Sequence, residues 1–116
     1  MQRLRHYRST WATLKPYARE LPALADITTY VDRLCAPRWF IRRFGPRSIT
    51  VRDGRGARAA HGDATRQTIF MPCRLRFDWV VLEEVAHCLV PAPAAAHGPE
   101  FARTFHDLVG RMMGRD

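Results

Sequence analysis

The stretch Trp79-Val-Val-Leu-Glu-Glu-Val-Ala-His-Cys-Leu-Val90 decides the fold of this 116-residue chain. On a helical wheel its apolar residues cover almost the whole circumference, and its one polar stripe holds Glu83, Glu84 and His87. A helix with this pattern is expected to be buried. Burying two carboxylates beside a histidine is costly unless a positive charge compensates them, and the stretch contains no Lys or Arg. A divalent metal ion is an economical compensation, so the stretch predicts a metal site.

The spacing within the stripe assigns a role to each residue. Glu83 and His87 are four residues apart, so both side chains can reach one ion from the same helix face. Glu84 would lie beside the ion, where a general base must be to take a proton from a metal-bound water. The spacing is that of the HExxH zinc-hydrolase motif, with Glu83 in place of the first His. Glu is a competent zinc ligand, but its charge should raise the pKa of the bound water and lower activity.

The residues that follow the stretch predict a third ligand and a last helix. Pro91-Ala-Pro93 ends the helix predicted over 79–90. His97 lies ten residues after His87, where a tight loop can return it to the same helix face. Pro99 suits the first turn of another helix. That helix carries a core stripe at helical spacing, made of Phe101, Phe105, Leu108, Val109 and Met112.

Upstream of Asp78, which is expected to cap the metal-binding helix, the pattern predicts helices followed by strands. Residues 3–20 favour an amphipathic helix that Pro16 kinks or ends. Asp26 is a candidate N-cap for a helix whose apolar face runs from Ile27 to Cys35, before Pro37 ends it. A short aromatic segment at 39–44 follows.

Three strands are expected in the middle of the chain. Residues 48–53 alternate in polarity, Asp53-Gly-Arg-Gly56 is a hairpin turn signal, and residues 57–61 would form the returning strand. Residues 67–71 (Gln-Thr-Ile-Phe-Met) form the third candidate. The fold class expected is α+β, with N-terminal helices, a small antiparallel β-sheet of about three strands, an active-site helix and a C-terminal helix in one domain over 1–116.

The chain resembles a known family at this point. Residues 79–90 together with Ala96-His-Gly-Pro-Glu-Phe101 resemble the "HELAH … HGPEF" pattern of small SprT-like zinc metallohydrolases of actinobacteria and their phages. Upstream segments also resemble the family and follow its order: 30–34, 39, 49–52, 56–61 and 69–72. The resemblance covers roughly residues 22–114 in all. The resemblance implies a compact zincin-like fold. Carried over by position, it implies that His87 and His97 bind one Zn²⁺, that Glu84 is the catalytic base, and that Glu83 replaces the remaining ligand.

Charge and composition constrain the partners and the location. Formal net charge is +8, and residues 1–76 hold 16 Lys and Arg against 5 Asp and Glu. This balance is compatible with a nucleic-acid partner, although 18 of the 19 basic residues are Arg, which GC-rich coding also produces. The three cysteines form no CxxC pair, which argues against a disulfide scaffold and a zinc ribbon. No apolar run reaches about 18 residues and no signal peptide is recognisable, so a cytoplasmic protein without a membrane span is expected.

Three functions follow as hypotheses. The first is a zinc metallohydrolase, in particular a metallopeptidase with a peptide or protein substrate, that uses Glu84 as the base. The second is a catalytically impaired relative whose basic N-terminal part binds nucleic acid or a protein partner. The third is an iron(II) oxygenase, because two His and one carboxylate also describe that ligand set, although such residues usually lie on barrel strands.

Overall fold

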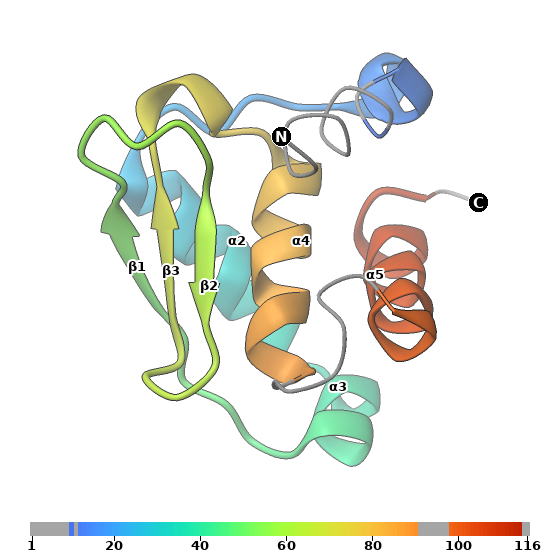
Figure 1. Ribbon diagram of the computed structural model, residues 1–116. Helices are drawn as coiled ribbons and strands as arrows, with labels where there is room; N and C mark the ends of the chain where they lie inside the picture. The colour runs from blue at the N-terminus through green and yellow to red at the C-terminus, as the bar shows by residue number, and fades with distance from the viewer. Residues whose placement is uncertain (1–9, 11, 91–97, 115–116) are drawn as a thin grey trace.

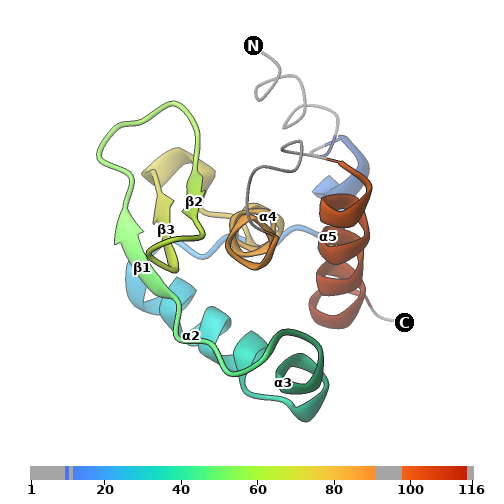
Figure 2. The ribbon, with the colours of Figure 1, turned by 60° about the horizontal axis from the view of Figure 1, so that its bottom comes forward.

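The computed structural model describes residues 10, 12–90 and 98–114 (Figure 1). Helix α4 (Asp78–Leu89) lies at the centre, with a three-stranded sheet on one side and helix α5 (Pro99–Met112) on the other. Figure 2 looks nearly along α4 and shows helix α2 (Leu24–Cys35) lying against the sheet and α4. The α+β fold class expected from the sequence is therefore confirmed. Within the described residues, no helix is both long and apolar enough to cross a membrane.

Burial of α4 explains its all-round apolar pattern. Every residue of the helix except His87 is buried. Asp78 was expected to be the N-cap, but it is the first residue of the helix. The N-cap is Phe77. The Asp78 carboxylate still satisfies donors at this end, because Oδ1 accepts the backbone N–H groups of Trp79 at 2.9 Å and Arg19 at 3.1 Å. The start of α4 is thereby tied to the N-terminal segment.

The helices before the sheet differ from expectation mainly at their ends. The apolar face of α2 is confirmed by burial of Ile27, Tyr30, Val31 and Leu34. The helix begins at Leu24, so Asp26 lies in its first turn and accepts the Ala23 N–H at 3.2 Å instead of being the N-cap. The aromatic segment forms a helix, α3 (Arg38–Phe44). Of the helix expected over 3–20, residues 1–9 and 11 lie outside the described part, and a short 3₁₀ helix, η1 (Lys15–Tyr17), contains Pro16.

The sheet is mixed, which corrects the expected antiparallel arrangement. Its strands are β1 (Thr50–Asp53), β2 (His61–Asp63) and β3 (Thr68–Met71), in the order β1-β3-β2. β3 pairs parallel with β1 and antiparallel with β2, so the hairpin predicted at 53–56 and the strand predicted at 57–61 are wrong. The physical reason is hydrophobicity. β3 is the most apolar and most buried strand, so it takes the central place, whereas the Ala-rich segment after β1 contributes only its last residue to β2.

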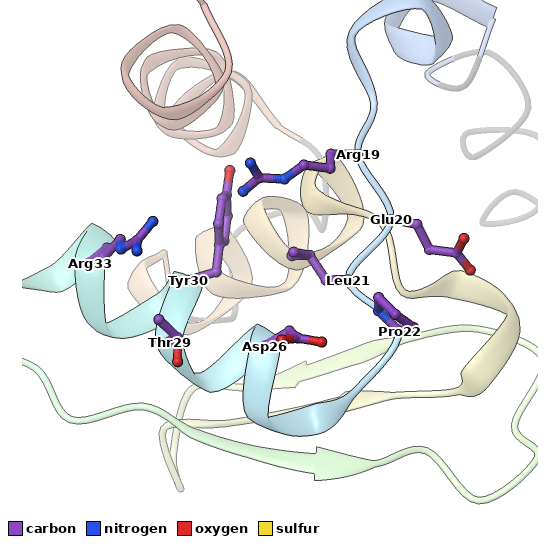
Figure 3. A pocket seen from close by; sticks show the side chains of 8 residues that line it. All are labelled: Arg19, Glu20, Leu21, Pro22, Asp26, Thr29, Tyr30 and Arg33. Carbon is purple, nitrogen blue, oxygen red and sulfur yellow. The ribbon is translucent and has the colours of Figure 1, made fainter.

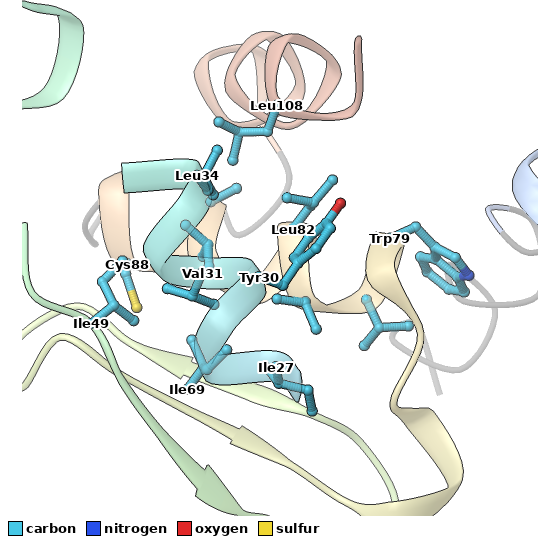
Figure 4. Packing of buried hydrophobic residues seen from close by; sticks show 14 of the residues in the cluster. Ile27, Tyr30, Val31, Leu34, Ile49, Ile69, Trp79, Leu82, Cys88 and Leu108 are labelled. Carbon is cyan, nitrogen blue, oxygen red and sulfur yellow. The ribbon is translucent and has the colours of Figure 1, made fainter. Parts of the chain in front are cut away.

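One core joins the inner face of the sheet to the helices (Figure 4). The sheet contributes Ile69 of β3 and Ile49, the residue just before β1. The helices contribute Val31 of α2, Leu82 of α4 and Leu108 of α5. α5 has the expected Pro99 in its first turn and buries Phe101, Thr104, Phe105 and Leu108. The core places α4 so that only its His87 edge keeps exposed surface.

A buried arginine joins three segments of this core. Arg76 is 8% exposed and donates to the carbonyl oxygens of Met71 at 3.0 Å and Pro22 at 2.9 Å, and its Nη2 lies 3.1 Å from the Asp53 carboxylate. Arg76→Ala is expected to lower the free energy of unfolding by about 3 kcal/mol, because two carbonyls lose charged donors, while the half-exposed Asp53 adds little. Urea unfolding measures the change. Arg74→Ala, at an exposed neighbour, should change it by less than about 0.5 kcal/mol. Equal midpoints for both variants would refute this role.

Candidate functional site

The three residues of the polar stripe lie in the middle of α4. Glu83 and Glu84 have no exposed surface, and His87, one turn after Glu83, is partly exposed. The prediction that Glu83, Glu84 and His87 share one helix is confirmed. His97, predicted as the third ligand, lies outside the described residues. Among the residues that are described, no group of three or more His, Cys, Asp or Glu side chains forms a metal-ligand cluster.

Strand β2 packs directly against the candidate site through Gly62. A Cβ atom at this position would lie 2.2 Å from the Glu84 carbonyl oxygen and 3.0 Å from the His87 Cβ. Only glycine allows the strand to come this close to the helix. β2 is also an edge strand of the sheet, so it forms one wall beside Glu84 and His87. Sequence reasoning missed Gly62, because the strand predicted at 57–61 ended before it, whereas β2 spans His61–Asp63.

The first turn of α5 forms the opposite wall. The rings of His87 and Phe101 stack with their centroids 4.5 Å apart and an angle of 28° between their planes. Phe101 is 3% exposed and is the last residue of the His-Gly-Pro-Glu-Phe segment. The fold therefore brings the two halves of the recognised pattern together through this aromatic contact. Stacking on a buried ring restricts the orientation of the His87 imidazole.

Cys88 belongs to the core. Its Sγ lies 3.7 Å from the carbonyl oxygens of Asp63 and Thr68, so the side chain faces the sheet and not the exposed edge. Burial, and then the nearby Glu84 carboxylate, raise the pKa of the Cys88 thiol to about 12. The thiol is therefore protonated at neutral pH and is a poor ligand or nucleophile there.

Thiol reactivity tests this placement. Burial also raises the pKa of Cys35 to about 11, whereas Cys73 is exposed. At pH 8 the folded protein should react rapidly with a disulfide reagent at Cys73 alone, because the other two thiols are protonated and Cys88 is also buried. All three should react in guanidinium chloride. Rapid labelling of Cys88 in the native protein, located by peptide mass analysis, would contradict its core position.

Two further histidines lie away from the site. His61 is exposed and stacks on Phe70, with ring centroids 5.8 Å apart, on the sheet face opposite Gly62. It does not face α4, so it is placed as an ordinary strand histidine. His106 is exposed on α5.

A separate hollow of about 380 Å³ lies beside α2 (Figure 3). Tyr30, whose ring is buried, extends its hydroxyl toward the Arg19 guanidinium, and Arg33 lies on the other side of the ring. The Tyr30 hydroxyl has no hydrogen-bond partner within the described part of the chain. Burial, and then the Asp78 carboxylate, raise its pKa. The lining holds two arginines, Arg19 and Arg33, and two carboxylates, Glu20 and Asp26, so its formal charges balance.

Comparisons of the chain with protein-family models, with curated proteins and with solved structures found no match.

Proposed function

We propose that this chain is a zinc-dependent metallohydrolase that cleaves peptide bonds, with Glu83, His87 and His97 as metal ligands and Glu84 as the base. The observation that carries the proposal is the buried helix α4, whose single polar stripe is Glu83, Glu84 and His87. Two carboxylates without exposed surface require positive charge or donors beside them, and a metal ion is one source of that charge. A carboxylate and an imidazole one helical turn apart fit the donor chemistry of zinc.

The surroundings of the stripe support the same chemistry. Zinc, when bound, supplies a Lewis acid that polarises a carbonyl and makes water more acidic. Glu84, next to the ligand Glu83, would accept the proton of the attacking water and pass it to the leaving amine. Phe101 holds the His87 ring in orientation. β2, at the edge of the sheet beside Glu84, offers backbone groups with which an extended peptide can pair.

The metal content of the purified protein tests the proposal without a substrate. Protein prepared without chelator should contain about one equivalent of zinc, measured by plasma mass spectrometry, and His87→Ala should lose it because two ligands do not hold zinc tightly. His106→Ala, at an exposed histidine of α5, is the matched control and should keep the metal. Zinc-free wild-type protein, or one equivalent of iron instead of zinc, would refute this assignment.

The second candidate is a catalytically impaired protein whose basic part binds nucleic acid, and Glu83 at the position of a histidine favours it. Glu83→His separates the two candidates. If the natural site is impaired, this variant should bind zinc about tenfold more tightly, which is the size of effect that changes around a metal site have on affinity. Competition with a chromophoric chelator measures the zinc affinity. An unchanged affinity would show that Glu83 is already an effective ligand.

A cytoplasmic location is part of the proposal. The three cysteines form no disulfide with one another, as expected for a reducing compartment. Fractionation of the producing cells tests it.

A further inference from the structure

The face of the sheet that points away from α4 carries a row of three side chains that the proposed hydrolase does not use. In register, Arg52 of β1 lies beside Phe70 of β3, and Phe70 lies beside His61 of β2. The neighbouring row, which includes Ile69 and Gly62, faces the core and α4. Since side chains alternate along strands, Arg52, Phe70 and His61 share the outer face. Among the described α-helices, none covers this face, because α2 and α4 both lie on the other one (Figures 1 and 2).

The row presents flat stacking surfaces to solvent. His61 and Arg52 are exposed and Phe70 is partly exposed. The rings of His61 and Phe70 stack on one another, with centroids 5.8 Å apart and 27° between their planes, so a base can extend this stack on the outer face of the exposed His61 ring. Arg52 lies beside Phe70 in register, on the strand away from His61, and adds an exposed guanidinium to the row. Aromatic rings and guanidinium planes of this kind stack on the faces of unpaired nucleic-acid bases.

Three of the seven arginines in residues 47–76 lie near one end of the row. Arg55 and Arg58 lie in the connection after β1, and Arg74 lies in the short helix η2 (Cys73–Leu75) after β3. These segments leave the same sheet end and touch there, because a Cβ at Gly54 would lie 2.6 Å from the Pro72 nitrogen. All three arginines are exposed, and within the described residues they form no ion pair.

We propose that this outer sheet face, defined by Arg52, Phe70 and His61 with Arg55, Arg58 and Arg74 at its end, binds single-stranded nucleic acid. Bases stack on Phe70 and His61, and the arginines contact phosphates. A duplex fits poorly, because its base faces are stacked inside the helix and a flat sheet does not enter its grooves. An acidic peptide could neutralise the arginines but would leave the aromatic pair without a stacking partner. The inference concerns the face opposite the metal site and does not depend on catalysis.

Fluorescence anisotropy with a labelled oligothymidylate of about 12 nucleotides tests the proposal at several salt concentrations. The intact protein should bind it, and Phe70→Leu should weaken binding roughly tenfold, because leucine keeps apolar volume but cannot stack. His61→Ala changes an exposed residue and should weaken binding in the same direction without affecting the fold. Arg52→Gln should lower the slope of log affinity against log salt by about 0.7.

Arg42→Gln is the matched control, because Arg42 is an exposed arginine of α3, away from the sheet. It should leave the stacking contribution intact and bind nearly as tightly as the wild type. The proposal is overturned if Phe70→Leu and His61→Ala bind as tightly as Arg42→Gln. It is also overturned if duplex DNA of equal length or polyglutamate competes as well as the unlabelled single strand. Zinc content is unaffected by these variants, so failure here is distinguishable from failure of the hydrolase proposal.

Discussion

Glu84→Gln is expected to lower peptide hydrolysis by a factor of about 10²–10⁴, the contribution typical of a positioned acid–base group. Glutamine has nearly the shape of glutamate, so the packing of this fully buried position should be preserved. Its amide cannot accept the proton of the attacking water. Hydrolysis of a fluorescently labelled unfolded protein such as casein measures the loss, with zinc restored to one equivalent in each sample.

Two comparisons make the result specific. Glu84→Gln should retain its zinc, because the proposed ligands are Glu83, His87 and His97. Glu100→Gln, at an exposed glutamate in the first turn of α5, should retain both zinc and activity. If Glu84→Gln cleaves casein as fast as the wild type while holding zinc, Glu84 is not the base. Loss of zinc in this variant would make Glu84 a ligand instead.

Gly62→Ala is expected to lower the free energy of unfolding by about 3 kcal/mol, at the upper end of the usual cost of overpacking. The added Cβ would lie 2.2 Å from the Glu84 carbonyl oxygen, which belongs to the backbone of α4 and cannot rotate away. Either β2 or α4 must move. Because this contact lies beside Glu84 and His87, the variant should also bind zinc more weakly.

Gly110→Ala is the matched control for the same chemical change. Gly110 lies within α5, and no atom outside its local helix backbone lies within 4 Å of an added Cβ. Alanine there should raise stability by about 0.5–1 kcal/mol, through its higher helix propensity. Urea unfolding of both variants gives the opposite signs directly. A neutral Gly62→Ala would mean that β2 does not pack against α4 as closely as the structure shows.

Local pattern was sufficient for the elements that are defined by short-range periodicity. The almost entirely apolar circumference of 79–90 predicted the buried helix α4, and the stripe from Phe101 to Met112 predicted α5. The alternation around Thr50 and the apolar run before Pro72 located β1 and β3. In each case the spacing of apolar residues along the chain determines which side of the element is buried. The polar stripe of Glu83, Glu84 and His87 is a property of the same periodicity.

The tertiary structure decided what depends on residues far apart in sequence. β3, and not the segment after β1, pairs with β1, because the most apolar strand takes the covered centre of the sheet. The same pairing places Gly62 against α4 and turns His61 and Phe70 to the opposite face. These positions follow from the order of the strands. That order depends on how segments far apart in the chain are buried together, so a short stretch of sequence does not determine it. The sequence alone thus determined the buried helix α4 and its one polar stripe. Only the tertiary structure decided that β2 and Phe101 form its walls, because those contacts join segments that are distant along the chain.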